Sequence, residues 1–263
     1  MTSFVDKSIE ALRSTHDELA GVVNDLSDDQ LTAKSAASEW SVAQVLSHLG
    51  SGAEISLATL RSAVDATPAP DQGFNENVWA RWNALSAREQ AAGFLAADEE
   101  LVVALEALTA AEREALQVKL AFLPTPMPLA GYAGMRLNEA ALHSWDVRVS
   151  LDPAAVIADD IADVLAEHLS TDLSFLLGFT SKADALASPA VVELRGTPFV
   201  LAITDTVSLA QAAAVPPTAT FSGPLEAALR LVAGRLTAAY TPDGVDVTGN
   251  VSLDDLRRVF PGF

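Results

Sequence analysis

The stretch YAGMRLNEAALHSWDVRV, residues 132–149, decides the fold class of this chain. Its apolar residues surround the expected helix on most sides, which is typical of a helix packed inside a protein. Within it, Glu139 and His143 are four residues apart and share one helix face, and Arg136 and Asp146 extend this polar stripe. Unpaired charge is costly in a protein interior. The stripe therefore predicts either a salt-bridge network or a metal site.

Two helices are expected upstream of this stretch. Apolar residues recur at alternating spacings of three and four over residues 9–26, which predicts a helix with His16 on its inward side. Ser41 and Gln44 form a capping-box pattern, which predicts the start of a second helix over residues 42–64.

The next part of the chain predicts a loop followed by more helix. Residues 71–86 resemble a loop that contains Trp79 and Trp82, both expected to anchor the core or the loop, with the lining of a substrate cleft as the alternative. A third long helix is expected over residues 87–108 and a short one over residues 110–120. Together with the stretch 132–149, these helices predict an up-and-down four-helix bundle.

The sequence pattern changes near residue 150. Beyond it we expect one helix, then short strands separated by turn residues, with two further helices. The expected helices are 157–177, 225–236 and 254–260, and the expected strands are 191–194, 199–203, 218–222 and 245–247. The fold class is therefore α+β, with a metal-binding four-helix bundle over residues 1–150 and a small α+β domain over residues 151–263.

Composition argues against several classes of function. The chain has 16 Lys and Arg residues against 35 Asp and Glu residues, a net charge of −19. Such a field repels phosphate backbones and anionic membrane surfaces, so we expect neither a nucleic-acid nor a membrane partner. The absence of a signal-peptide pattern and of a long apolar stretch favours a cytoplasmic location. The chain has no cysteine, so any thiol chemistry would need the sulfur of a small molecule.

A third residue, His48, completes a possible ligand set with Glu139 and His143. Two imidazoles and one carboxylate suit Zn²⁺ and leave a fourth position open for water or substrate. Manganese, iron and nickel also suit such a set. Arg136 and Asp146 would either orient the histidines from outside the ligand set or form an ion pair.

The remaining histidines carry weaker signals. His16 lies in an apolar stripe and is expected to be a core residue hydrogen-bonded to a neighbour, with a role near the metal as the alternative. His168 falls in the second domain, and we expect it to face solvent.

Several segments resemble a known family. WSVAQVLSHL, residues 40–49, resembles a signature of the DinB-like metal-binding bundles, and residues 136–146 resemble the R-x-x-E-x-x-x-H-x-x-D segment of their mycothiol-dependent maleylpyruvate isomerase branch. Residues 218–224 and 231–235 are similar to the C-terminal domain of that branch, which looks like a sterol-carrier-protein fold. The resemblance covers nearly the whole chain.

The resemblance implies a zinc site built from His48, Glu139 and His143, with the thiol mycothiol as cofactor or co-substrate. Zinc-bound thiols ionise at neutral pH, and the thiolate then attacks an electrophilic carbon. In an isomerase the thiolate adds to a conjugated double bond, the bond rotates and the thiol leaves, whereas in a transferase the adduct is the product.

The resemblance also implies that Arg235 reaches the active site and binds a substrate carboxylate. We take Arg235, Arg136 and Asp146 as candidate catalytic residues, and Arg235 and Trp82 as candidates for binding the cofactor. The expected enzyme is a mycothiol-dependent isomerase or S-transferase that acts on a small electrophile as a monomer or small homo-oligomer.

Two alternatives remain open from the sequence. The same metal site would suit a hydrolase or lyase that ionises water and uses no thiol. A non-catalytic stress protein would instead hold a structural metal in the bundle and an apolar ligand in the C-terminal domain.

Overall fold

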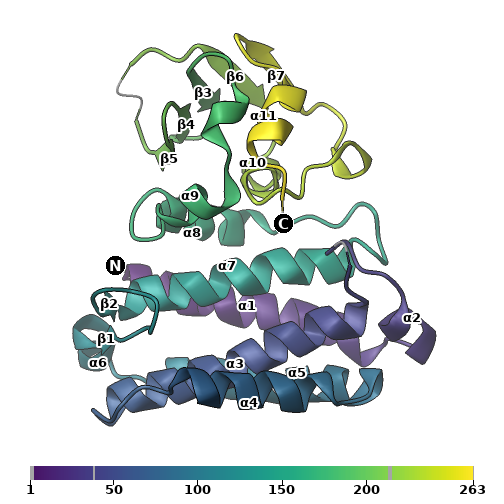
Figure 1. The fold of residues 1–263 in the computed structure, drawn as a ribbon, viewed down its shortest axis with the longest axis vertical. Coiled ribbons are helices and arrows are strands. Elements are labelled where there is room, and N and C mark those ends of the chain that lie inside the picture. Colours follow the sequence, from purple (N-terminus) through teal and green to yellow (C-terminus); the bar gives the residue numbers. More distant parts are fainter. Residues whose placement is uncertain (1–2, 38, 213–214, 263) are drawn as a thin grey trace. The chain divides into compact units, whose positions relative to one another are not determined.

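The computed structural model describes residues 3–37, 39–212 and 215–262, and it divides into two compact units (Figure 1). One unit ends at Ala155 and the other begins at Val156. The first is dominated by long helices, and the second is built on a five-stranded sheet. The predicted α+β class is confirmed.

The first unit is a bundle of four long helices. They are α1 (Phe4–Asn24), α3 (Val42–Val64), α5 (Ala87–Glu106) and α7 (Leu129–Arg148). Each packs on two others in cyclic order: α1 on α7, α7 on α3, α3 on α5, and α5 on α1. The Tyr132 hydroxyl donates to the carbonyl of Ser56, and the Arg136 guanidinium donates to that of Leu49. Helices α3 and α7 therefore run antiparallel.

Capping boxes fix where three of the four bundle helices begin, namely α1, α3 and α5. The Gln44 amide N–H donates to Ser41 Oγ at 3.2 Å, and the Ser41 N–H donates to Gln44 Oε1 at 2.8 Å. The predicted start of α3 is thus confirmed, and Ser86 and Glu89 cap α5 in the same way. Such caps satisfy N–H groups that have no partner within the helix.

Some connections in the first unit differ from the prediction. The predicted loop over residues 71–86 contains a helix, α4 (Gln72–Asn83), and a short helix, α2 (Asp28–Thr32), lies between α1 and α3. The helix predicted over residues 110–120 is shorter, α6 (Ala110–Ala115). It leads into a two-stranded antiparallel pair, β1 (Gln117–Val118) with β2 (Met127–Pro128).

The second unit is a sheet with helices packed on it. Its strand order is β5-β4-β3-β6-β7, and the β3–β6 pair is parallel whereas the other pairs are antiparallel. The strands are β3 (Ala190–Leu194), β4 (Val200–Ile203), β5 (Val207–Ala210), β6 (Ala219–Ser222) and β7 (Asp246–Gly249). The helices are α8 (Asp159–Leu169), α9 (Leu176–Thr180), α10 (Leu225–Val232) and α11 (Leu253–Val259), with short 3-10 turns at Ala183–Ala185 and Ala238–Tyr240.

Two predictions for the second unit were wrong in detail. The single helix expected over residues 157–177 is two helices, α8 and α9, because the chain turns after His168, whose carbonyl accepts from both Thr171 and Leu173. Strand β5, in which Val207 and Leu209 are buried, was not predicted.

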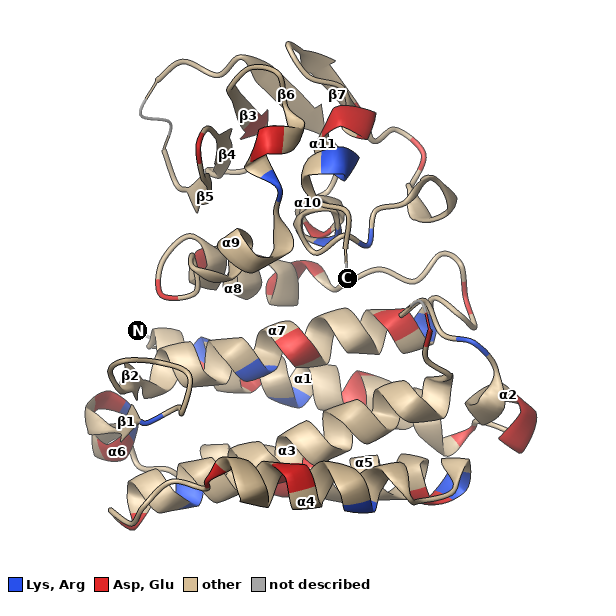
Figure 2. Ribbon diagram, viewed as in Figure 1, with Lys and Arg blue, Asp and Glu red and all other residues tan. Residues whose placement is uncertain are grey.

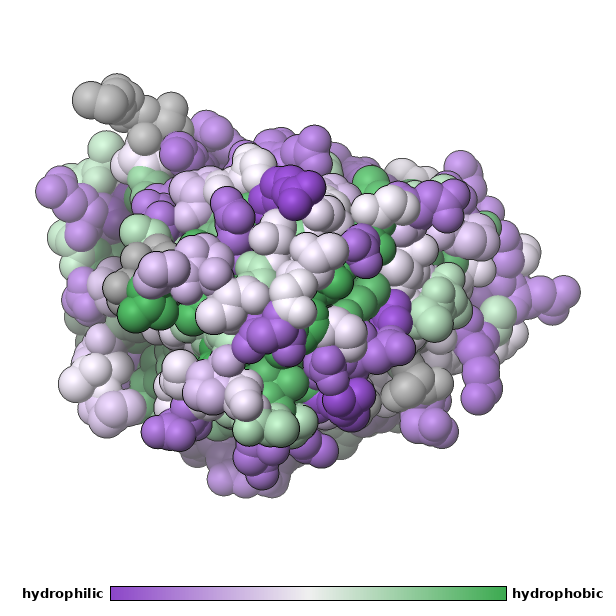
Figure 3. Space-filling view, turned by 90° about the horizontal axis from the view of Figure 1, so that it is seen from above, coloured by the Kyte–Doolittle hydropathy of each residue, from purple (hydrophilic) through white to green (hydrophobic). Residues whose placement is uncertain are grey.

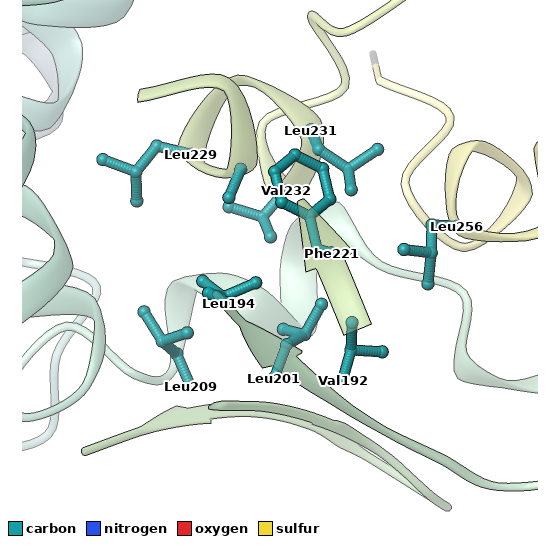
Figure 4. A pocket seen from close by; sticks show the side chains of 10 residues that line it. Val192, Leu194, Leu201, Leu209, Phe221, Leu229, Leu231, Val232 and Leu256 are labelled. Carbon is teal, nitrogen blue, oxygen red and sulfur yellow. The ribbon is translucent and has the colours of Figure 1, made fainter. Parts of the chain in front are cut away.

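A small apolar cavity lies between the sheet and the helices of the second unit (Figure 4). Its free volume is about 10 Å³, room for about one water molecule. The lining residues are Val192, Leu194, Leu201, Leu209, Phe221, Ala228, Leu229, Leu231, Val232 and Leu256.

The surface is mixed in character. On the face drawn in Figure 3, polar residues predominate and apolar residues lie among them in smaller groups. Within the described parts of the chain, no helix combines the length and apolar character needed to cross a bilayer.

Candidate metal centre

The three predicted ligands come together in the first unit. His48 projects from α3, and Glu139 and His143 project from α7. His48 Nε2 lies 3.0 Å from Glu139 Oε2, and His143 Nε2 lies 3.8 Å from the same oxygen. One ligand atom from each residue lies within 4.8 Å of the others. The antiparallel packing of α3 and α7 thus joins positions 91 residues apart.

This donor set fits a divalent metal. Ligand atoms about 2.1 Å from a tetrahedral Zn²⁺ lie roughly 3.4 Å from one another, close to the separations of 3.0 and 3.8 Å seen here. The side chains of His48, Glu139 and His143 are 37%, 48% and 14% exposed. One side of the cluster is therefore accessible to solvent, as a metal that must accept a substrate requires.

Asp146 holds His143 in a defined orientation. Its carboxylate lies 2.8 Å from His143 Nδ1 and is fully buried. A carboxylate can only accept this hydrogen bond, so Nδ1 carries the hydrogen, and a neutral His143 presents its lone pair from Nε2. A carboxylate behind a ligating histidine is the usual outer partner at such sites.

Glu139 is ionised at neutral pH. Desolvation raises the pKa of its carboxyl group, but the hydrogen bond from His48 and the nearby charges of His143, His48 and Arg136 together lower it to about 2. A cation can therefore bind Glu139 without first displacing a proton from it.

Trp40 forms one wall of the cluster. Its ring centroid is 5.1 Å from that of His48 and 6.0 Å from that of His143, and the two imidazoles are 4.8 Å apart. The residue is 37% exposed. Sequence reasoning used Trp40 only as part of a motif and assigned it no role, although its position eight residues before His48 places it just outside the start of α3.

Arg136 and Asp146 do not form the ion pair that was one of the two predicted options. Arg136 is buried and donates to Asp98 of α5, whereas Asp146 bonds His143. Acidic and basic residues are interspersed along the bundle helices, with both signs on α7 (Figure 2). The stripe is buried at Arg136 and Asp146 but not at Glu139, which remains partly exposed.

His16 belongs to a second cluster of ionisable groups. As predicted, it is a buried core residue hydrogen-bonded to a neighbour: its Nδ1 lies 2.9 Å from Asp98. His16, Asp17 and Glu99 also bring potential ligand atoms within 4.8 Å of one another. Arg13 pairs with both Asp17 and Glu99. Arg13 of the chain itself therefore already supplies positive charge to both carboxylates of this cluster.

A comparison with known families assigns most of the first unit to one of them. The family model described as the mycothiol maleylpyruvate isomerase N-terminal domain matches residues 12–148, which contain all three candidate ligands. The chain belongs to this family.

Two solved structures resemble the chain over both of its units. A crystal structure of the mycothiol-dependent maleylpyruvate isomerase matches with a TM-score of 0.65 and 17% identity, over 95% of this chain and 98% of that chain. A histidine-to-alanine mutant of that enzyme matches with the same TM-score, 16% identity and the same coverage. At these identities the likeness establishes a shared fold. No curated protein matches the chain.

The two remaining candidate site residues are Trp82 in the first unit and Arg235 in the second. Trp82 of α4 is 3% exposed, and its indole N–H donates to Glu54 at 2.9 Å. Its ring packs against Gly50 and Gly93, which is a core position and not a free surface for a cofactor. Arg235 belongs to the second unit, just after α10, and its guanidinium donates to the carbonyl of Ala233 at 3.1 Å.

The prediction for His168 was wrong. The residue is fully buried in the second unit, and its Nδ1 lies 2.9 Å from Asp172. Its spacing from Ile161 and Leu165 places it on the inward face of α8, a signal present in the sequence.

The hydrogen bond between Asp146 and His143 leads to a testable prediction about metal affinity. Asp146→Asn should weaken zinc binding by about tenfold or more, because the amide no longer fixes the Nδ1–H form of His143 through a charge-assisted bond. Zinc affinity would be measured by competition with a chromophoric chelator. Asp172→Asn is the matched control, since it alters an equivalent histidine–aspartate pair in the second unit. Equal affinities in the wild type and Asp146→Asn would contradict the assignment.

Proposed function

We propose that this protein is a zinc-dependent enzyme that uses mycothiol as an isomerase or thiol S-transferase on a small electrophilic substrate. The observation that carries the proposal is the convergence of His48, Glu139 and His143 at a cluster with one accessible side. Membership of the mycothiol maleylpyruvate isomerase family supports the choice of thiol and of reaction class.

The residues at this site would have different roles. His48, Glu139 and His143 would hold the metal, and a bound Zn²⁺ would lower the pKa of a thiol placed at its open position. Asp146 keeps the Nε2 lone pair of His143 directed at the cluster. The exposed face of Trp40 would limit where the thiol and its substrate can lie beside the two imidazoles.

Arg235 would bind a carboxylate of the substrate. A guanidinium can hold a carboxylate through two parallel hydrogen bonds, which orients a planar substrate as well as binding it. This role comes from the family resemblance of residues 231–235.

The alternatives gain less support from the structure. An apolar ligand-binding role for the second unit would need a cavity of suitable size, whereas the cavity in Figure 4 has a volume of about 10 Å³ and small-molecule sites occupy about 300–1,000 Å³. A thiol-free hydrolase would use the same three ligands, so only the response to the thiol separates it from our proposal.

The proposal is tested by metal analysis followed by titration with mycothiol. We expect about one zinc per chain, and calorimetric binding of mycothiol to the zinc form that disappears when the metal is removed. Maleylpyruvate is the first electrophile to assay for thiol-dependent isomerisation, and Arg235→Met should raise KM while leaving the zinc content unchanged.

If the protein binds zinc but not mycothiol, the thiol-dependent function is wrong, and the site is that of a hydrolase or a structural metal. If the purified protein binds no zinc, the cluster is a set of ion-paired side chains and not a metal site.

A further inference from the structure

A buried ion network joins all four long helices next to the candidate metal centre. Asp98 of α5 is 4% exposed and accepts from Arg136 of α7 at 2.5 Å and from His16 of α1 at 2.9 Å. The same Arg136 nitrogen, Nη2, also donates to the carbonyl of Leu49 on α3 at 2.9 Å. Sequence reasoning did not single out Asp98.

The network touches the two ligand-bearing helices close to their ligands. Leu49 directly follows His48 on α3, and Arg136 lies one turn before Glu139 on α7. A Cβ built on Gly52, one turn beyond His48, would lie 3.1 Å from Arg136 Nη1. The guanidinium therefore lies tightly against the backbone of α3, next to the ligand positions.

Asp98 determines how Arg136 is held. A buried guanidinium needs a counter-charge, and Asp98 is the carboxylate with which Arg136 pairs. Desolvation raises the pKa of Asp98, but Arg136 and His16 together lower it below its usual value, so the pair remains ionised. The hydrogen bond from His16 holds Asp98 Oδ2 in place. Because the carboxylate is rigid, it thereby also sets the direction of Oδ1, which accepts from Arg136.

We propose that Asp98 is a positioning residue for the metal centre: it locks Arg136 between α7 and α3 and thereby sets the separation of His48 from Glu139 and His143. The inference rests on the proposed function, because it assumes that these three residues bind the metal. Asp98 itself does not touch the cluster and acts through Arg136.

Asp98→Asn is the direct test, measured as zinc affinity and as the absorption spectrum of the cobalt-substituted protein. The asparagine has the same shape and can still accept a hydrogen bond but carries no charge, so Arg136 loses its buried counter-charge. We expect zinc affinity to fall by about tenfold, the lower end of the range for residues that support metal ligands indirectly, and the cobalt spectrum to change.

Two controls separate positioning from general stability. Glu226→Gln removes the charge from a carboxylate, 2% exposed, that pairs with Arg230 within α10 of the second unit. Leu105→Ala removes a fully buried side chain of α5 that takes no part in the network. Both should lower the free energy of unfolding and leave zinc affinity and the cobalt spectrum unchanged.

A milder pair of variants covers the case in which Asp98→Asn does not fold. His16→Ala removes one donor to Asp98 and should weaken zinc binding severalfold. His16→Asn keeps a donor near the position of Nδ1 and should restore the affinity.

Wild-type zinc affinity and an unchanged cobalt spectrum in Asp98→Asn and His16→Ala would overturn the inference. An equal loss of affinity in Leu105→Ala would overturn it as well. Failure of the wild type to bind zinc would overturn the proposed function together with the inference, so the two failures are distinguishable.

Discussion

His48→Ala should abolish zinc binding and with it all thiol-dependent activity. The variant removes one of three ligands, and it is the ligand that α3 contributes alone. Replacing residues that merely support ligands costs about 10–100-fold in affinity, so loss of a ligand should exceed 100-fold. Zinc content after dialysis and a chelator competition measure the effect.

Compared metal-free, His48→Ala and the wild type should differ little in stability. His48 is 37% exposed, and substitutions outside the core usually alter the free energy of unfolding by about 0.5 kcal/mol or less. His168→Asn serves as a control, because it removes an imidazole from the second unit but keeps a donor toward Asp172. A His48→Ala protein that retains stoichiometric zinc would exclude His48 as a ligand.

Gly50→Ala should destabilise the bundle by about 3 kcal/mol or more. A Cβ at this position would lie 2.2 Å from Trp82 Cη2 and 2.5 Å from Trp82 Cζ3, far inside van der Waals contact. Overpacking a core commonly costs about 1–3 kcal/mol, and here the indole is held between Gly50 of α3 and Gly93 of α5 with its N–H bonded to Glu54. Urea unfolding of the metal-free protein measures the loss.

A double variant tests the cause of this loss. Trp82→Leu frees the space that the new methyl group needs, so Gly50→Ala should cost less in that background than in the wild type. Gly21→Ala is the matched control: the space around that glycine of α1 is open, so the change should stabilise the helix by up to about 1 kcal/mol. Equal costs of Gly50→Ala in both backgrounds would contradict the packing argument.

The fold was predictable wherever apolar periodicity was long. Helices α1, α3, α5 and α7 each repeat their apolar positions over several turns, and the capping residues Ser41 and Gln44 mark a boundary that depends only on local chemistry. Helix α4 was missed because only Val78 and Trp82 of its twelve residues are buried. A single buried pair four residues apart does not distinguish a helix from a loop with two anchors.

The residues of the candidate cluster were predictable from the sequence, but the hydrogen-bond partners of the residues around it were not. The Glu139 and His143 spacing on one helix limits them to one face, and His48 on a second predicted helix completed the ligand set before the family resemblance supported it. Whether Arg136 bonds Asp146 or another residue depends on which helix packs opposite, which no local pattern records. Asp98 carried a signal all the same: it occupies an inward position between the apolar residues Phe94 and Leu101 of α5.

The order of folding and metal uptake follows from the separation of the ligands. His48 and Glu139 are 91 residues apart, and they meet only when α3 and α7 lie side by side in the assembled bundle. A metal cannot gather them in the unfolded chain at the small entropic cost that short ligand spacings allow. The bundle core, closed by Phe94, Leu46 and their neighbours, must form first. If the cluster binds zinc as proposed, a cell short of the metal would hold this protein folded but inactive, and later metal would activate it without new synthesis.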